Sequence, residues 1–134
     1  MSRWNKSIFK KAREFQKIAN PKCANTPKKF NNSEKMYVND FVLEELAEFM
    51  EAETLVDQAD ALGDLIYFVL SRAANNGINL EFILTSIHYA NMRKFPNGQV
   101  IIENGKVKKP KGWEGPEYEI MNELNLQSEN GSFH

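Results

Sequence analysis

The fold is decided by residues 44–70, which read EELAEFMEAETLVDQADALGDLIYFVL. Apolar residues recur at spacings of three and four on both sides of Thr54, which predicts two consecutive helices. Thr54 is a residue type that starts helices, and Asp57 three positions later resembles a capping box with the shorter acid. We therefore expect one helix that ends near Ala52 and a second that runs from Thr54 to Asn75.

The flanking sequence predicts further helices and little else. A first helix covers about residues 3–19, and a fourth runs from Asn79 to about Lys94. The Asn104-Gly105 pair between short β-type runs indicates a hairpin, and a short helix follows from Pro116. We expect an all-α, four-helix bundle-like fold with a short C-terminal hairpin and loop extension. It forms one domain over residues 1–126, followed by a disordered polar tail over residues 127–134.

Composition places the chain among ordinary globular proteins. Its 134 residues are 42% hydrophobic and 26% charged, typical of one domain with one core. The single cysteine, Cys23, cannot form an intramolecular disulfide, which favours a reducing compartment. No apolar run approaches the roughly 20 residues of a membrane span, and the N-terminus has no signal-peptide core. We expect a cytoplasmic protein without a membrane partner.

The net charge of −1 hides a strong segregation of charge. Residues 36–71 contain nine acidic residues and no Lys or Arg, whereas residues 1–35 contain ten Lys or Arg and two acids. One interpretation is that these blocks pair as surface salt bridges, each contributing little. Another is an acidic metal cage flanked by basic segments, which suits a metal–polyphosphate ligand. Nucleic acid is the weaker partner, because the acidic block would repel its phosphates.

The acidic residues follow helical spacing. Glu44, Glu45 and Glu48 lie in one sector of their helix, opposite its apolar residues. On the next helix Asp60 and Asp64 are one turn apart, and Asp64 is the only charge in residues 61–70, so we expect it to be buried. A buried carboxylate needs a partner or a metal, and Mg²⁺ is the cation that suits such oxygens. A solvated acidic face is the alternative for the earlier helix.

Four parts of the sequence carry a resemblance to a known family. The pattern of Glu44, Glu45 and Glu48 on one helix, followed by residues 61–67 on the next, resembles the MazG-like all-α nucleoside triphosphate pyrophosphohydrolases. Residues 88–94 (HYANMRK) and 104–113 (NGKVKKPKGW) are similar to the branch with dUTPase-like and Cof-like members, as is the Glu14-Phe15-Gln16 segment. The resemblance spans about residues 12–116.

This resemblance implies hydrolysis of a nucleoside triphosphate, possibly dUTP in the branch concerned, between the α- and β-phosphates. It implies Mg²⁺, with Mn²⁺ as a substitute, and a homodimer or homotetramer whose sites are completed across subunits. The residues that match its motifs are taken in three groups. Metal ligands are Glu45, Glu48, Asp60 and Asp64; the catalytic base is Glu44 or Glu45; substrate contacts are Phe15, Gln16, Asn91, Arg93, Lys94, Lys109 and Trp113.

One departure from the family pattern concerns a metal ligand, and two alternative functions also remain open. The second helix carries Ala61 where the family has a glutamate ligand, so its role passes to Asp60, with Asp57 as the substitute. A phosphoribosyl-ATP pyrophosphohydrolase would use the same carboxylates on a different nucleotide. A catalytically inactive helical module, whose acids bind a basic partner, is the second alternative.

Overall fold

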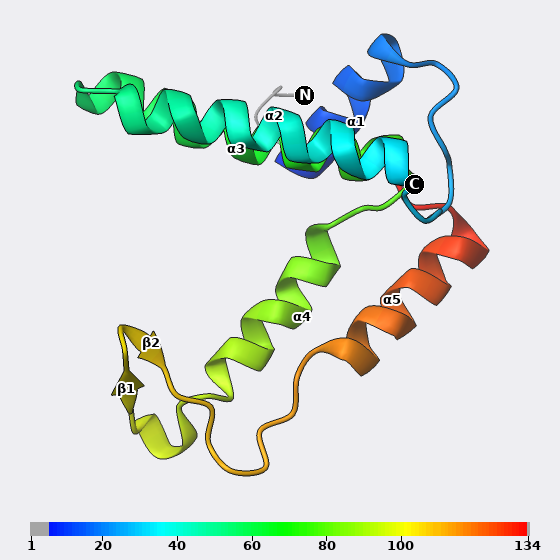
Figure 1. Ribbon diagram of the computed structural model, residues 1–134. Coiled ribbons are helices and arrows are strands. Elements are labelled where there is room, and N and C mark those ends of the chain that lie inside the picture. The colour runs from blue at the N-terminus through cyan, green and yellow to red at the C-terminus, as the bar shows by residue number, and fades with distance from the viewer. Residues whose placement is uncertain (1–5, 134) are drawn as a thin grey trace.

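The computed structural model describes residues 6–133. Five α-helices dominate it, with one 3-10 turn and one two-stranded sheet (Figure 1). In chain order these are α1 (Ile8–Ala19), α2 (Asn32–Glu51), α3 (Leu55–Asn75), α4 (Glu81–Met92), η2 (Pro96–Gly98), β1 (Ile102–Glu103), β2 (Lys106–Val107) and α5 (Glu117–Asn130). The prediction of an all-α fold with a short C-terminal extension is confirmed. Within the described residues no helix is both long and apolar enough to cross a membrane.

Helices α1, α2 and α3 each begin directly after a polar residue whose side chain accepts a hydrogen bond from a backbone amide in the first turn of the helix. Thr54 accepts from the Asp57 amide at 3.1 Å and begins α3 as expected. The reciprocal capping box lies instead at α2, where Asn31 and Glu34 bond to each other's amides at 2.8 and 2.9 Å. This box starts α2 at Asn32. The predicted start of the first helix at residue 3, with Trp4, lies outside the described residues; α1 begins after the cap at Ser7.

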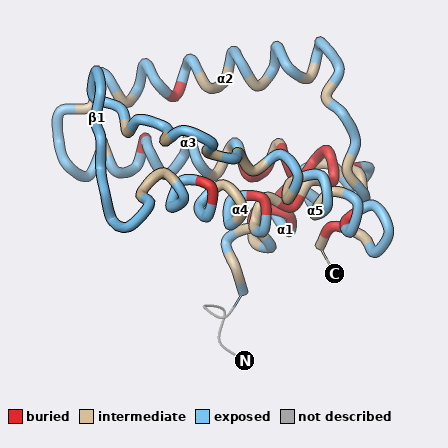
Figure 2. The backbone as a smooth tube through the Cα atoms, turned by 90° about the horizontal axis from the view of Figure 1, so that it is seen from below, coloured by how far each residue is buried: buried red, intermediate tan, exposed pale blue. Residues whose placement is uncertain are grey.

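The helices form two groups in place of one closed bundle. Helices α2 and α3 make a long antiparallel hairpin, and α1 packs on α3 (Figure 1). Helices α4 and α5 pack on each other and diverge from that hairpin. Buried residues gather near the junction of the two groups, whereas most of α2 is exposed (Figure 2). Large apolar residues such as Met50 on α2 and Ile66 on α3 are therefore uncovered, at 79% and 60% exposed.

The junction at the end of α3 fixes the loop that precedes α2. The Asn75 and Asn76 carbonyls accept hydrogen bonds from the Ala24 and Lys28 amides, at 3.0 and 2.9 Å. The next residue, Gly77, has φ +70°, and a β-carbon there would collide with the Thr26 carbonyl. Glycine is therefore required both for its backbone angle and for this close approach.

The hairpin forms as its sequence predicts. Asn104 and Gly105 both have positive φ, 52° and 76°, as a two-residue type I′ turn needs. The strands pair with Ile102 opposite Val107.

The prediction of a disordered tail from Gln127 is wrong for the described residues. Helix α5 continues to Asn130, and both Gln127 and Ser132 are buried. The Gln127 side chain bonds to both the amide and the carbonyl of Asn79, at 3.0 and 2.8 Å, and the Ser132 amide donates to the Asn25 carbonyl at 3.1 Å. Long-range polar contacts order this segment, and composition alone cannot reveal such contacts.

Candidate active site

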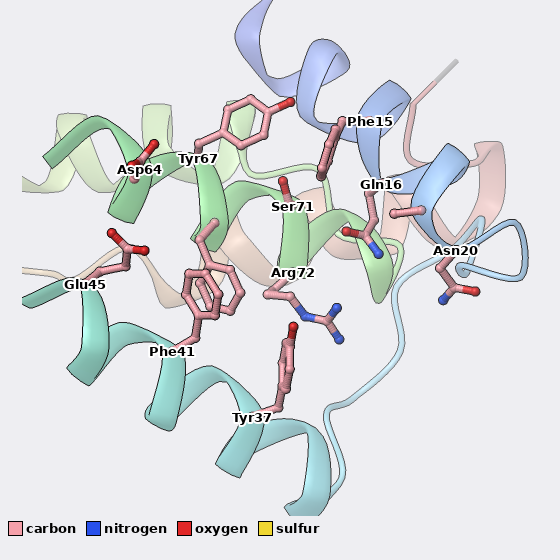
Figure 3. Close-up of a pocket in the computed structure, with 12 residues that line it drawn as sticks. Phe15, Gln16, Asn20, Tyr37, Phe41, Glu45, Asp64, Tyr67, Ser71 and Arg72 are labelled. Carbon is pink, nitrogen blue, oxygen red and sulfur yellow. The ribbon is translucent and has the colours of Figure 1, made fainter. Parts of the chain in front are cut away.

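A pocket of about 600 Å³ opens along one side of α3. Helix α3 forms its base, with α1 on one side and α2 on the other (Figure 3). The volume lies within the range of small-molecule sites. Its lining residues are Phe15, Gln16, Ala19, Asn20, Tyr37, Phe41, Glu45, Asp64, Tyr67, Phe68, Ser71 and Arg72.

One end of the pocket is acidic. Glu45 from α2 and Asp64 from α3 lie at this same end (Figure 3). Glu45 is 7% exposed, and burial is the main cause that raises its pKa. The negative charges of Glu48, Asp64 and Glu44 raise this pKa further, as does a hydrogen bond with Glu48. The carboxylates are therefore close enough to repel one another, and this end of the pocket favours a cation.

The middle of the pocket is aromatic. Phe15 meets Tyr67 edge-on, with ring centroids 5.7 Å apart. On the opposite side Phe41 stacks on Phe68, with centroids 3.8 Å apart and planes 12° from parallel. Tyr37 continues this wall from α2. Such surfaces suit a flat, conjugated ligand.

Three buried side-chain atoms of the described residues lack a hydrogen-bond partner, and all three belong to residues that line this pocket. They are Glu45 Oε2, Ser71 Oγ and Arg72 Nε. The Arg72 guanidinium lies over the Tyr37 ring, 4.8 Å from its centroid. A buried group without a partner costs about 1–3 kcal/mol. Their concentration in one pocket makes this pocket the candidate ligand site.

The predicted acidic residues divide between two places. Glu48 and Asp60 line a shallow depression beside the pocket, together with Glu51 and Asp57. The expectation that Asp64 is buried is wrong, because the apolar side of α3 around it is not covered by another helix of the chain. Glu45 is the buried carboxylate instead.

The acidic end fits a divalent cation by its chemistry. Its donors are hard carboxylate oxygens, one of them buried without a partner, and α2 has no basic residue in its last turn to neutralise them. Within residues 6–133 no three His, Cys, Asp or Glu side chains already stand in the arrangement of a metal site. The fit therefore rests on charge and burial.

The predicted basic contacts lie elsewhere in the chain. None of Asn91, Arg93, Lys94, Lys109 and Trp113 lines the pocket. They gather where α4 ends and the hairpin returns, away from the α2–α3 hairpin (Figure 1). Lys94 and Lys109 lie over the Trp113 ring, 5.3 and 5.0 Å from its centroid. Arg93 donates to the Glu114 and Gly115 carbonyls and pairs with Glu119 at 3.3 Å.

Of the predicted site residues, the pocket contains Phe15, Gln16, Glu45 and Asp64. The sequence did not predict the other residues that line it. Phe41 lies one turn and Tyr37 two turns before Glu45 on the same side of α2, and Arg72 lies two turns beyond Asp64 on α3. These three residues could have been predicted, because each lies at a spacing of four or eight residues from Glu45 or Asp64 and therefore on the same side of its helix.

A family model described as phosphoribosyl-ATP pyrophosphohydrolase matches residues 12–91, more than half of the chain. The chain belongs to this family. The match covers α1 from residue 12, all of α2 and α3, and most of α4, and it includes every residue that lines the pocket. A search of curated proteins finds no match.

Membership of the phosphoribosyl-ATP pyrophosphohydrolase family explains the chemical character of the pocket. The family is part of the MazG-like all-α superfamily, so the resemblance noted from the motifs is confirmed at that level; the dUTPase-like branch is not shown. A pyrophosphohydrolase that acts on a nucleotide accounts for a pocket with an acidic end and aromatic walls.

Proposed function

We propose that the protein hydrolyses a nucleotide between its α- and β-phosphates in the α1–α2–α3 pocket and releases pyrophosphate, with Mg²⁺ as cofactor. The observation that carries this proposal is the buried Glu45 carboxylate, whose Oε2 atom has no hydrogen-bond partner and which lies with Asp64 at the end of an aromatic pocket. A nucleotide combines phosphates with a flat heterocycle. A cation at the acidic end of the pocket would bind the phosphates, and the aromatic residues suit the heterocycle. An inactive module would not require a buried carboxylate whose pKa is raised by burial and by three acidic neighbours.

Glu45, Glu48, Asp60 and Asp64 are the residues that would hold Mg²⁺, with Glu44 beside them. When bound, the ion supplies positive charge that offsets the phosphates. Glu44 or Glu45 accepts the proton of the attacking water as its oxygen bonds to phosphorus, and the bridging P–O bond breaks to release pyrophosphate. The raised pKa of Glu45 favours this role, since a base is most effective when its pKa is near the working pH.

Phosphoribosyl-ATP is the first substrate to test, because the matched family carries its name. A second candidate is a nucleoside or deoxynucleoside triphosphate such as dUTP. The observation that favours it is that the match ends at Asn91, so the hairpin and the Trp113 segment lie beyond it. These are the segments that resemble the dUTPase-like branch.

The working unit proposed is a homodimer or homotetramer. Large apolar side chains on α2 and α3 remain exposed, including Leu43, Leu46, Ile66 and Val69, and the burial of such side chains is a feature of subunit interfaces. The basic residues around Trp113 lie away from the pocket of their own chain, so a second copy would bring such residues to it. We also propose a cytoplasmic location, in keeping with a single free Cys23.

The test is a panel of phosphoribosyl-ATP, the four NTPs and the four dNTPs plus dUTP, scored for pyrophosphate in Mg²⁺ and in EDTA. We expect one class to yield monophosphate and pyrophosphate, with activity lost in EDTA and restored by Mg²⁺ or Mn²⁺. Asp64→Asn should reduce the rate at least about tenfold, a barrier change of about 1.4 kcal/mol. Release of orthophosphate in place of pyrophosphate, or full turnover in EDTA, would contradict the proposal.

A further inference from the structure

A chain of side-chain amides runs from the loop before α2 to the wall of the pocket. Asn76 Nδ2 donates to the carbonyls of Lys28 and Lys29 at 3.4 and 3.3 Å. Asn75 Nδ2 donates to Asn76 Oδ1 at 3.2 Å, and Gln16 Nε2 donates to Asn75 Oδ1 at 3.0 Å. Because a backbone carbonyl can only accept, the first contact fixes which way Asn76 faces, and each later amide follows.

A second donor reinforces the orientation of Asn75. Asn20 Nδ2 donates to the same Asn75 Oδ1 at 2.7 Å. A reversed Asn75 amide would place its NH₂ group against two other NH₂ groups. Gln16 is 6% exposed and Asn75 is 8% exposed, so water cannot readily replace these bonds. The amide of Gln16 therefore has one stable orientation.

This orientation leaves Gln16 Oε1 as the atom that faces the pocket (Figure 3). We propose that Gln16 is a specificity-determining residue whose carbonyl oxygen accepts a hydrogen bond from an N–H group of the nucleobase. Asn75 and Asn76 are positioning residues that keep this oxygen, and not the NH₂ group, turned toward the ligand. The inference rests on the proposed function, since it assumes that the ligand is a nucleotide.

The position of Gln16 favours a base over a sugar or a phosphate. Its neighbour Phe15 offers a ring face to the same pocket, so the two residues can meet one heterocycle at its face and its edge. Asn75, which holds Gln16, lies 11 residues beyond Asp64, about 16 Å along the axis of α3. The phosphates belong at the acidic end, so the heterocycle is the part of a nucleotide that reaches the amide.

The experiment measures the binding of nucleoside monophosphates by calorimetry in EDTA. Two pairs of probes differ only by an amino group: AMP with purine riboside 5′-monophosphate, and CMP with 2-pyrimidinone riboside 5′-monophosphate. UMP with 3-methyl-UMP tests a ring N–H. The wild type should bind the N–H-bearing member of at least one pair about tenfold more tightly, the value of one well-formed hydrogen bond. Gln16→Met, which keeps the length of the side chain without its acceptor, should bring that ratio close to one.

Asn75 provides the test of positioning. Asn75→Leu frees the Gln16 amide to turn and should also abolish the ratio, whereas Asn75→Asp keeps an oxygen for Gln16 and Asn20 and should retain it. Asn39→Ala is the control: Asn39 is an exposed amide residue of α2 that does not line the pocket and donates to its neighbour Asp40, so the ratio should not change. Melting curves identify any variant that fails to fold, and Gln16→Met then decides alone.

The outcomes separate this inference from the proposed function, because binding in EDTA needs neither metal nor turnover. An unchanged ratio in Gln16→Met overturns the inference even if pyrophosphate is released. A wild type that binds none of the three N–H-bearing monophosphates, or that does not discriminate within any pair, also overturns it. A wild type that discriminates as expected but releases no pyrophosphate from any nucleotide supports the role of Gln16 and contradicts the proposed function.

Discussion

Replacement of Asn76 by alanine tests the junction at the end of α3. Asn76 is fully buried, and its side chain makes three hydrogen bonds, to the Lys28 and Lys29 carbonyls and to Asn75. The buried Asn75 amide would lose its acceptor, at a cost of about 1–3 kcal/mol, and the two longer bonds contribute about 0.5 kcal/mol each. Asn76→Ala should therefore destabilise the protein by about 3 kcal/mol.

This cost converts into a melting temperature. At about 2.1 cal/mol/K per residue, unfolding of a chain of 134 residues has an entropy of about 0.28 kcal/mol/K, so 3 kcal/mol corresponds to about 10 °C. Circular dichroism at 222 nm measures the shift. Asn122→Ala is the control, since Asn122 is an exposed residue of α5, and it should change the melting temperature by no more than about 2 °C. A shift that small in Asn76→Ala would refute the role given to these hydrogen bonds.

Three further predictions concern the acidic residues and a glycine. Because burial and neighbouring acids raise the pKa of Glu45, its ionisation favours the unfolded state. The metal-free protein should thus lose stability as pH rises above the ordinary value of 4.5, and Glu45→Gln should flatten that part of the melting-temperature profile. Asp60→Ala should reduce the Mg²⁺-saturated rate at least about tenfold, whereas Asp57→Ala should keep most activity and cost about 1 kcal/mol at the start of α3; the reverse pattern would place the ligand at Asp57. Gly77→Ala should lower the urea midpoint by more than Gly98→Ala, which has the same positive φ but open space around it, and equal effects would exclude a steric cause.

Local signals in the sequence predict most of the helices and the hairpin. Thr54 and the Asn104-Gly105 pair act through contacts within a few residues, so their effect can be read from the chain itself. The carboxylate pair of Glu45 and Asp64 also follows from helical spacing, because two antiparallel helices bring matching faces together.

Long-range contacts account for what the sequence could not predict. Gln127 is ordered by Asn79, 48 residues earlier, and Gln16 is oriented by Asn75, 59 residues later. Neither pair of hydrogen-bonded residues produces a periodic pattern in the sequence. The exposure of Asp64 was also missed, since an apolar helix indicates burial only where another element covers it, and the part of α3 around Asp64 remains exposed although α1 and α2 both pack on this helix.

The indole of Trp113 has a consequence for how the protein can be observed. Its Nε1 donates to the Ala90 carbonyl at 2.7 Å, and the ammonium groups of Lys94 and Lys109 lie over its ring. Its emission therefore reports the electrostatic surroundings of the end of α4 and the segment after the hairpin, and not the α1–α2–α3 pocket. With Trp4 replaced by phenylalanine, a ligand that occupies the pocket of one chain alone leaves the emission unchanged, whereas an anion that draws the two lysines away from the ring alters it. The chain thus contains an optical reporter that distinguishes these two events.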